Sequence, residues 1–372
     1  MQEKLNIRFP AEWEPQSAVM LTWPHAQTDW APILDEVIPC FVDIAKEILK
    51  REKLLIVCLS IDTVKAQLNE GIAGQARNDL SKIIFREIPT NDTWARDHGP
   101  ITTFSKRKAH LLDFGFNGWG LKFASNLDNQ ITQRLYKSGA FDAGHTLPLL
   151  QSSSPDYHNL RTYILEGGSI ESDGIGTILT TSECLFAPNR NEFANKEEIE
   201  QFFAEVFGTE RVLWLDHGHL EGDDTDGHVD TLARFCNANT IAYVSNRHCG
   251  LDPQAPPQFA NDEQFEALSK MEAQLKTFKT AAGQPYNLVP LPMAAAVYDE
   301  NGKQLPATYA NFLIINGAVL MPTYGTTLDD VAKEALQTAF PDREIIGINC
   351  LPLIKQHGSL HCVTMQFPKN IV

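Results

Sequence analysis

The sequence predicts an α/β protein made of five similar modules within a single domain that spans residues 1–372. Five windows have the apolar spacing of amphipathic helices, and short β-rich runs follow them. No shift in composition marks a domain boundary, and 43% hydrophobic with 21% charged residues is ordinary for a globular chain. Helices and strands that alternate within one chain favour an α/β arrangement.

The helix windows recur at nearly regular intervals. Lys196–Phe207 shows the pattern well, because its apolar residues fall at helical spacing with acids between them. In Thr327–Phe340, two aspartates occupy the first turn, where the helix dipole favours negative charge. Consecutive windows start 92, 70, 66 and 65 residues apart, near Leu34, Asn126, Lys196, Asp262 and Thr327.

Short strands are expected after and between these helices. Four windows are followed by clear β-rich runs, at Leu54–Leu59, Val212–Leu215, Leu288–Leu291 and Glu344–Ile348. The second window has the weakest follower, near Thr146–Leu150. The repeated order predicts modules around an axis, each contributing to one active site, although an ordinary α/β sheet also gathers its site at strand ends. Further strands are expected at Ile101–Phe104, Ile175–Thr180, Ile241–Val244, Phe312–Ile315 and Val363–Met365.

Charge and cysteine content exclude several classes of protein. Lys and Arg number 31 and Asp and Glu 47, which gives a formal charge of −16. We therefore expect small cations to be attracted and nucleic acid to be repelled. The first residues lack the apolar core of a secretory signal, and no apolar run is long enough to cross a bilayer. Seven scattered cysteines without a CxxC pair favour a reducing cytoplasm.

Four polar segments lie beside glycines and strand-like runs, and each falls in a different module. The remaining module, the fourth, offers only Thr308–Asn311 in the equivalent place. If the modules surround an axis, the four segments meet at one point. They are Asn91–Pro100, Glu166–Ser169, Asp223–Thr231 and His357–Cys362.

His228 and Asp230 lie two residues apart at what we expect to be the head of a strand. Side chains at this spacing share one face of a strand, which would place an imidazole beside a carboxylate. Such a pair can serve as general acid and base near neutral pH. The alternative is an acidic surface loop before a strand, and the other three segments make us prefer the first interpretation.

Cys362 differs from the other six cysteines, which we expect to be small buried hydrophobes. It precedes the alternating run Val363–Gln366, and Gly358 and Ser359 leave its approach open. A nucleophilic cysteine needs a positive group that favours its thiolate. A substrate guanidinium or a protonated His228 could supply that charge.

Asp97, Glu166 and Asp230 are carboxylates for which the sequence offers no obvious buried partner, whereas we expect Arg96 to pair with an acid as part of the structure. Buried carboxylates need a cation or hydrogen-bond donors. A planar guanidinium presents donors in a fixed fork that suits two carboxylates. A cysteine, a histidine and three acids therefore match a guanidino substrate.

Two further interpretations stay open. The loop Phe114–Gly120 is either a mobile lid that places Trp119 against substrate or a turn around a packed tryptophan. A metal site would leave Cys362, Glu166 and Asp97 unexplained, but histidine and acid spacing permits one. Its ligands would be His217, His219, His228 and Asp223 or Asp226.

Five pieces of the sequence together resemble the agmatine deiminase and bacterial-type peptidylarginine deiminase family, within the guanidino-group-modifying superfamily. The resemblance extends from Trp23 to Pro368. It implies a five-bladed α/β propeller of pseudo-fivefold symmetry (pentein-type), in agreement with the module count. The pieces are NDTWARDHGP, EGGSIESDGIGT, DDTDGHVDTLARF, ATYANFLIING and GSLHCVTMQFP.

The resemblance also implies roles for single residues. Cys362 corresponds to the nucleophile, His228 to the general acid and base, and Glu166 to the carboxylate that orients it. Asp97 and Asp230 correspond to the pair that holds the guanidinium. The remaining expected substrate-binding residues are Asp224, Trp94 and Trp119. The chain departs from the agmatine pattern around the pocket, at His98, Gly118, Leu121 and the run Gln356–Ser359 before the nucleophile.

The implied activity is that of a cytoplasmic agmatine deiminase. It hydrolyses agmatine to N-carbamoylputrescine and ammonia through a covalent amidino-cysteine intermediate, without a metal or organic cofactor. Free or peptidyl arginine and other guanidino compounds are alternative substrates. A metal-dependent hydrolase and a non-catalytic guanidino- or polyamine-binding protein are the alternative functions. Beyond a small guanidino substrate we expect no nucleic acid or membrane partner, and a homo-oligomer is compatible with the sequence.

Overall fold

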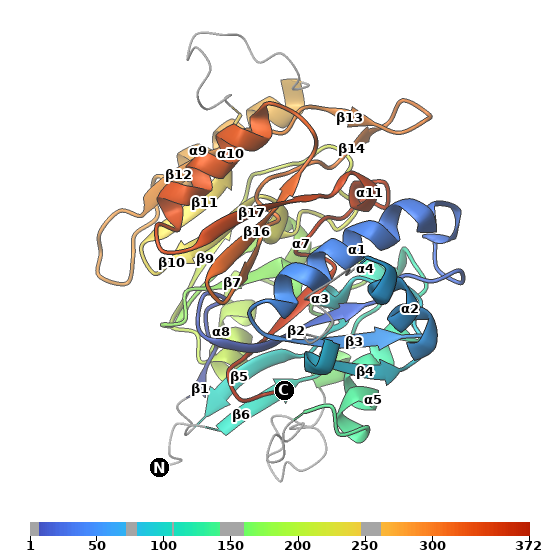
Figure 1. Cartoon of the computed structure of the whole chain (residues 1–372). Coiled ribbons are helices and arrows are strands. Elements are labelled where there is room, and N and C mark those ends of the chain that lie inside the picture. The colour runs from blue at the N-terminus through green and yellow to red at the C-terminus, as the bar shows by residue number, and fades with distance from the viewer. Residues whose placement is uncertain (1–6, 72–79, 106–107, 142–159, 247–261) are drawn as a thin grey trace, which may run out of the picture.

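The computed structural model describes residues 7–71, 80–105, 108–141, 160–246 and 262–372. In these residues the strands form five sheets of three or four strands and one two-stranded hairpin. Long helices connect neighbouring strands within four of these sheets, so the predicted α/β class is confirmed (Figure 1). The arrangement of the sheets as propeller blades stays a prediction, and the expected run Thr146–Leu150 lies outside the described residues.

Four of the five sheets share one pattern, in which an antiparallel pair is followed by a parallel strand. Two of them are β7 (Ile170–Ser172), β8 (Thr177–Thr181) and β9 (Arg211–Leu215), and β10 (Ala233–Asn237), β11 (Thr240–Val244) and β12 (Asn287–Leu291). The third is β15 (Leu313–Ile315), β16 (Ala318–Thr323) and β17 (Glu344–Asn349). The fourth has the order β18 (Thr364–Pro368), β2 (Gln16–Thr22), β3 (Lys53–Cys58) and β4 (Ile83–Glu87).

The fifth sheet is antiparallel throughout and contains β1 (Ile7–Arg8), β5 (Ile101–Ser105) and β6 (Lys108–Leu112). The separate hairpin pairs β13 (Val297–Tyr298) with β14 (Gln304–Leu305). Apart from the strand expected at His228 and Asp230, the strands expected within the described residues are present, with small differences at their ends.

Each parallel pair requires a crossover, and a helix supplies it. The predicted helices at Leu34, Lys196, Asp262 and Thr327 are confirmed to within one residue. Around Asn126 a 3-10 turn, Asp128–Gln130, leads into the short helix α5 (Ile131–Lys137). The crossover helices are α1 (Leu34–Leu49), α2 (Ile61–Gly71), α8 (Lys196–Phe207), α9 (Asp262–Leu275) and α10 (Leu328–Ala339).

Local sequence accounts for the ends of α8. The Asn195 side chain accepts a hydrogen bond from the backbone N–H of Glu198, which caps the first turn. Gly208 ends the helix in the left-handed conformation, with φ of 70°. One face of the helix, including Phe203 and Phe207, is buried against the neighbouring sheet.

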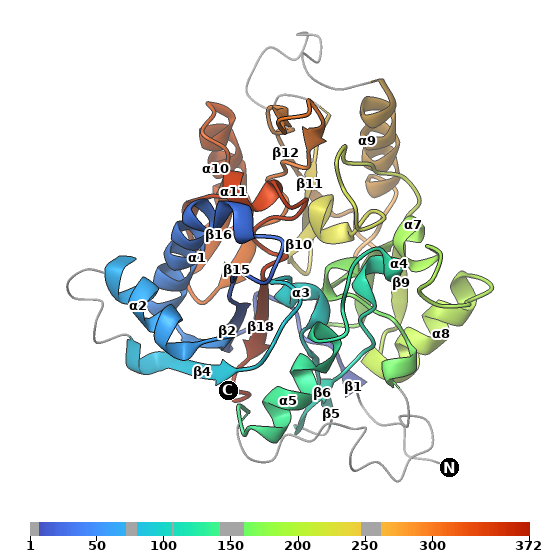
Figure 2. The same ribbon diagram turned by 90° about the vertical axis from the view of Figure 1, so that its right-hand side faces the viewer.

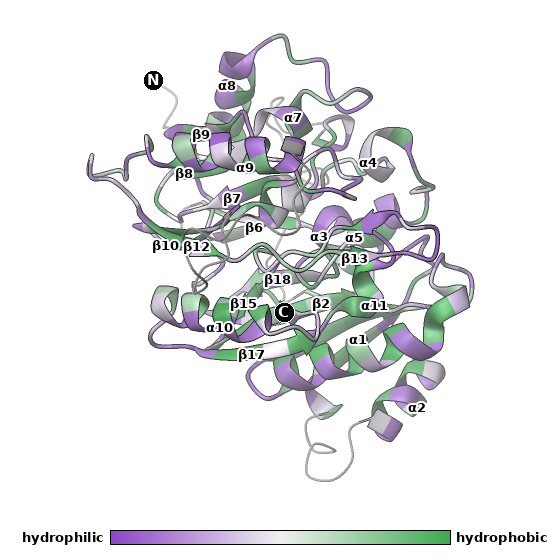
Figure 3. Cartoon of the chain, turned by 90° about the horizontal axis from the view of Figure 1, so that it is seen from above, coloured by the Kyte–Doolittle hydropathy of each residue, from purple (hydrophilic) through white to green (hydrophobic). Residues whose placement is uncertain are grey.

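The long helices lie on the outside of the molecule, and the short helix α3 (Ala95–His98) lies near its centre (Figure 2). Hydrophilic residues alternate with hydrophobic ones along α1 and α10, as expected for helices with one face on the core (Figure 3). No helix in the described ranges has both the length and the apolar character needed to cross a membrane.

The expected strand at His228 and Asp230 is wrong. These residues belong to a 3-10 turn, η7 (Val229–Thr231), with His228 at its N-terminus, and strand β10 begins only at Ala233. The Thr231 hydroxyl and backbone N–H both return to the carbonyl of His228, which closes the turn. The two side chains approach one another through this turn and not through the alternation of a strand.

Candidate active site

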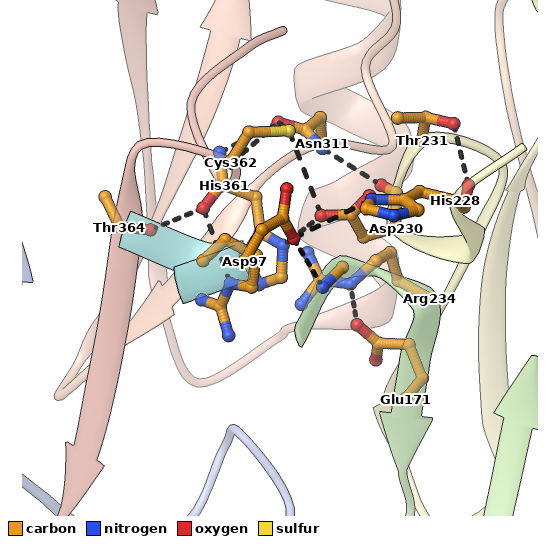
Figure 4. A network of polar contacts seen from close by, with 12 residues as sticks. Asp97, Glu171, His228, Asp230, Thr231, Arg234, Asn311, His361, Cys362 and Thr364 are labelled. Atoms are coloured by element: carbon orange, nitrogen blue, oxygen red, sulfur yellow. Dashed lines mark hydrogen bonds and ion pairs between the residues drawn. The ribbon is translucent and has the colours of Figure 1, made fainter. Parts of the chain in front are cut away.

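Four short segments from distant parts of the chain meet at the centre of the molecule. They are α3, the 3-10 turn η6 (Gly167–Ser169), η7 and the turn before β18. Contacts link α3 to η6 and η6 to η7, and α3 also contacts β18. The convergence expected from the sequence is therefore present, and Figure 4 shows Asp97, His228, Asp230 and Cys362 together.

Asp97 is fully enclosed and has a defined partner on each oxygen. Its Oδ1 accepts a hydrogen bond from the Gly168 backbone N–H at 3.0 Å, and its Oδ2 accepts one from the Trp119 indole at 3.0 Å. Oδ1 also lies 3.8 Å from Nδ1 of His228. Burial raises the pKa of Asp97 to about 6, although the nearby His228 and the Trp119 hydrogen bond lower it.

Asp230 presents one anchored and one unengaged oxygen. Oδ2 lies 2.7 Å from Nδ1 of His361 and 4.0 Å from the Cys362 sulfur. Oδ1 is buried and has no hydrogen-bond partner among the described residues. Burial alone would raise the pKa of Asp230, but the contact with His361 lowers it below its ordinary value. Asp230 is therefore a carboxylate at neutral pH.

His228 is completely buried, and neither ring nitrogen has a hydrogen-bond partner within the described part of the chain. Burial would lower the pKa of this imidazole, but Asp97, the adjacent Cys184 and Glu166 raise it well above its ordinary value. The ring is therefore protonated at neutral pH and can give up a proton. It can also take one back, as a general acid and base must.

Glu166 has a buried partner that the sequence did not reveal. Nε of Arg190 lies 3.0 Å from Oε1 and 3.1 Å from Oε2 of Glu166. The same guanidinium donates to Oδ2 of Asp226 at 2.5 Å and to the Thr225 carbonyl at 2.7 Å. Arg190 thus fixes Glu166 beside His228, and the expectation that Glu166 lacks an obvious buried partner is wrong.

Gly168 lies at the point where the functional groups come together. A Cβ atom added to it would lie 2.6 Å from Nδ1 of His228, 3.0 Å from Oδ1 of Asp97 and 3.1 Å from Oδ2 of Asp230. Contacts below 3.0 Å force a neighbour to move, so only glycine permits this approach. The second glycine of the EGG motif is therefore part of the site's geometry.

Cys362 is 4% exposed and is held by the side chain of Asn311. The Asn311 Oδ1 atom accepts from the backbone N–H of His361 at 2.9 Å and lies 3.4 Å from the Cys362 sulfur. Burial, together with Asp230 and Asp97, raises the pKa of the thiol well above its ordinary value. The resting thiol is therefore neutral, and a cation beside these two acids would favour its ionisation.

A pocket leads from the surface to this thiol. Cys362, Asp97, Trp94, Trp119 and Asp224, all predicted from the sequence, line it. Asp29 and Asp92 add further carboxyl groups, and no lysine or arginine is found among its described lining residues. Burial and the neighbouring Asp223 raise the pKa of Asp224 to about 7. Such a pocket favours a ligand with more than one positive charge.

Trp119 enters the pocket from an unusual backbone segment, α4 (Gly118–Leu121). Gly118, Trp119, Gly120 and Leu121 have φ of 70°, 55°, 83° and 70°, so four consecutive residues are left-handed. This conformation is unfavourable for residues with a Cβ atom, so it must be held by its surroundings. The Asn117 side chain caps the segment, and the Lys122 ammonium contacts the Asp224 carbonyl and Asp226 at 2.7 Å each.

The comparisons with known proteins agree with this geometry. The sequence model of the family described as Porphyromonas-type peptidyl-arginine deiminase matches residues 8–368. The chain belongs to this family. Agmatine deiminases and peptidyl-arginine deiminases are hydrolases that act on C–N bonds, so the predicted enzyme class is confirmed.

Relatives of this deiminase-family chain cover nearly its whole length. A Marinomonas protein named "putative agmatine deiminase" is 32% identical, over 98% of this chain and 95% of its own. A structure named "putative arginine deiminase" from Porphyromonas gingivalis is 50% identical, with a TM-score of 0.87 and coverage of 98% and 99%. A C. jejuni agmatine deiminase with substrate bound is 33% identical, with a TM-score of 0.80 and coverage of 98% and 97%.

The metal site suggested by histidine spacing does not form in this deiminase-family protein. His217 and His219 are exposed, and the nearest charged partner of His219 is Glu221 at 3.8 Å, whereas His228 is buried in the centre. Two other groups of potential ligand atoms lie within 4.8 Å of one another among the described residues. The groups are Glu166, Cys184 and His228, and Glu12, Glu171 and His361. The carboxylates of both groups already contact arginine side chains, Glu166 with Arg190, and Glu171 and Glu12 with Arg234.

Several residues of the site were not predicted from the sequence. Cys184, expected to be only a buried hydrophobe, lies beside Glu166 and His228. Asn311 comes from the fourth module, which had offered only a weak polar segment. Arg190, His361 and Glu12 complete the surroundings through buried contacts. Two features of the sequence could have pointed to these residues. One is the tripeptide Asn189–Arg190–Asn191, and the other is the histidine directly before Cys362.

Proposed function

We propose that the protein is a cytoplasmic agmatine deiminase, folded as one domain with five propeller blades over residues 1–372. The observation that carries the proposal is the acidic pocket that ends at Cys362. A guanidinium at its base faces Asp97 and Asp230, and a second positive charge on the tail faces carboxyl groups such as Asp224. Agmatine has both charges and no carboxylate.

The proposed reaction begins when the substrate cation binds. Asp97 and the unengaged Oδ1 of Asp230 accept guanidinium N–H groups, which places the central carbon near the Cys362 sulfur. The positive charge offsets the two acids that raise the pKa of the thiol, so the thiol gives its proton to solvent water, from which the ammonia formed later takes one up as ammonium. The thiolate then forms a C–S bond with the guanidinium carbon.

Ammonia leaves in the next step. The His228 imidazolium gives a proton to the departing nitrogen as the C–N bond breaks, and a positively charged amidino-cysteine remains. Neutral His228 then takes a proton from a water molecule, whose oxygen attacks the amidino carbon. The C–S bond breaks, the hydroxyl proton returns to sulfur, and the products are N-carbamoylputrescine and the neutral thiol. Neither step uses a metal or organic cofactor.

Two features of the pocket favour agmatine over free arginine. An α-carboxylate would enter among the carboxyl groups of Asp29, Asp92 and Asp224 without a lysine or arginine from the described lining to meet it. The names of the relatives are mixed, because they include both arginine and agmatine deiminases. The charge of the pocket, and not the names of the relatives, therefore supports agmatine as the substrate.

The test compares ammonia release from agmatine, free arginine and an arginyl peptide with blocked ends. We expect agmatine to have the highest kcat/KM, and equal or better turnover of either arginine substrate would refute the assignment. Intact mass spectrometry of the wild type, quenched in acid during turnover of agmatine, should reveal an adduct on Cys362. Cys362→Ala treated in the same way is the control and should remain unmodified. Binding without turnover by the wild type would instead favour a non-catalytic binding protein.

A further inference from the structure

The side chain that precedes Cys362 bridges two carboxylates in the interior. Nδ1 of His361 lies 2.7 Å from Oδ2 of Asp230, and Nε2 lies 2.7 Å from Oε2 of Glu12. His361 is 1% exposed, Asp230 is fully buried and Glu12 is 9% exposed. Figure 4 shows His361 between the nucleophile segment and Asp230. The three residues come from opposite ends and the middle of the chain.

The two contacts fix the number of protons in this group. Carboxylates only accept hydrogen bonds, and a neutral imidazole has a single N–H. Two contacts of 2.7 Å therefore require two protons shared among Glu12, His361 and Asp230, and the group carries one net negative charge. Burial, Arg234 and Arg96 lower the pKa of His361 below its ordinary value, although Glu12 and the hydrogen bond to Asp230 raise it, so the placement of the protons rests on the two short contacts.

Glu12 is the fixed end of this arrangement. Its Oε2 accepts from Nη2 of Arg234 at 2.8 Å, and its Oε1 accepts from the Ile314 backbone N–H at 2.8 Å. Although burial opposes ionisation, Arg234 and His361 lower the pKa of Glu12 well below its ordinary value. A carboxylate held at both oxygens is a rigid partner for the Nε2 side of His361.

Asp230 is the functional end. Since His361 occupies Oδ2, the unengaged Oδ1 is the oxygen left for a ligand. The backbone of His361 is also tied to Asn311, which contacts the Cys362 sulfur and donates to the Asp230 carbonyl. His361 therefore couples the position of the thiol to the orientation of the carboxylate.

We propose that His361, braced by Glu12, is a positioning residue that donates from Nδ1 to Asp230 and so presents Oδ1 of Asp230 to the substrate guanidinium. This inference rests on the proposed function for its kinetic consequence. Its structural core, the proton on Nδ1, is independent of any substrate. Free neutral imidazole has no fixed tautomer, so a defined Nδ1–H must come from this contact.

Two substitutions separate the two halves of the bridge. In His361→Asn the side-chain amide keeps a donor at the position of Nδ1 but does not reach Glu12. In His361→Gln the amide keeps a donor at the position of Nε2 but loses the contact with Asp230. We expect His361→Gln to lower kcat/KM by about 100-fold with a raised KM, since the carboxylate of Asp230 that receives the guanidinium is misplaced. We expect His361→Asn to lower it by no more than about 10-fold. Equal losses, or the reverse order, would overturn the proposal.

Nitrogen NMR of the wild type with labelled histidine supplies the second measurement. We expect a protonated Nδ1 on His361 at pH 7, assigned to this residue through scalar couplings along its side chain and backbone. The internal reference is His98, whose pKa burial lowers to about 3, so that its ring is neutral. An unprotonated Nδ1 on His361 would refute the proposal even if both variants fail to fold. If the wild type releases no ammonia from agmatine, the proposed function fails while this resonance still decides the inference.

Discussion

The indole nitrogen of Trp119 donates a hydrogen bond of 3.0 Å to Oδ2 of Asp97. This contact joins the left-handed segment at the pocket to a carboxylate that is expected to hold the substrate. Burial raises the pKa of Asp97 to about 6, and this hydrogen bond is one of the interactions that lower it. The charge on Asp97 therefore depends on the position of the segment.

Trp119→Phe should make the enzyme more sensitive to acid. Asp97 must be ionised to hold a cation, so kcat/KM should fall as the pH drops through about 6. Without the indole donor the charged form is less stable, so this fall should move to higher pH. We expect about a 10-fold loss of kcat/KM at pH 7, the usual size of one hydrogen bond to a charged group.

Trp214→Phe is a matched control for that variant. The Trp214 indole also donates to a carboxylate, Glu200, at 2.8 Å, but this pair does not line the pocket. Its pH profile should match that of the wild type. An unshifted acid limb in Trp119→Phe would show that the indole does not set the charge of Asp97.

Arg190→Lys should lower kcat more than it raises KM. Lysine keeps the positive charge but cannot contact Glu166, Asp226 and the Thr225 carbonyl together as the guanidinium does. Glu166 would then no longer be fixed beside His228, whose pKa it helps to raise. We expect a loss in kcat of about 10- to 100-fold and a basic limb displaced to lower pH.

The control for Arg190 is Arg211→Lys. Arg211 also uses several nitrogens, on Thr177 and the Tyr286 hydroxyl at 2.9 Å each, at a distance from the pocket. It should lose stability without a change in the pH profile. If both variants behave alike, the role of Arg190 is structural only.

The sequence could predict the identity of the central groups but not their support. Cys362 and Asp97 were found from local motifs and Asp224 from the family resemblance, and all three line the pocket. Arg190 meets Glu166 across 24 residues, and His361 meets Glu12 across 349. Neither helical nor strand periodicity carries information about pairs at such separations, because those patterns are local.

The error at His228 has a similar origin. The sequence after Gly227 is rich in β-branched residues, and on local propensity a strand could begin there. In the structure, Thr225 accepts from the backbone N–H of His228, and Thr231 closes the turn onto the His228 carbonyl. Hydroxyl groups that bond to nearby backbone compete with the strand and delay it to Ala233.

Gly168→Ala should abolish most of the activity. The added Cβ would lie 2.6 Å from Nδ1 of His228 and about as close to two carboxylates, so the functional groups must separate. We expect kcat/KM to fall by at least about 100-fold, because displacements of about 1 Å have this effect on positioned groups. Gly347→Ala is the control, since its Cβ would lie 2.8 Å from a Thr323 methyl group, in a strand outside the pocket. Similar melting temperatures with loss of activity only at Gly168 would support the geometry, and an active Gly168→Ala would contradict it.

Asp224 should make the choice of substrate depend on pH. Its pKa is raised to about 7 by burial and by Asp223, so the side chain is mostly neutral at pH 6 and charged at pH 8. The ratio of kcat/KM for agmatine to kcat/KM for butylguanidine, which lacks the terminal ammonium, should therefore increase with pH across this range. Asp224→Asn should remove the increase, while the exposed Asp330→Asn should keep it. Since both substrates carry the same guanidinium, the ionisation of Asp97 and Cys362 cancels in the ratio, and a ratio that is flat in the wild type would show that Asp224 does not face the substrate's tail.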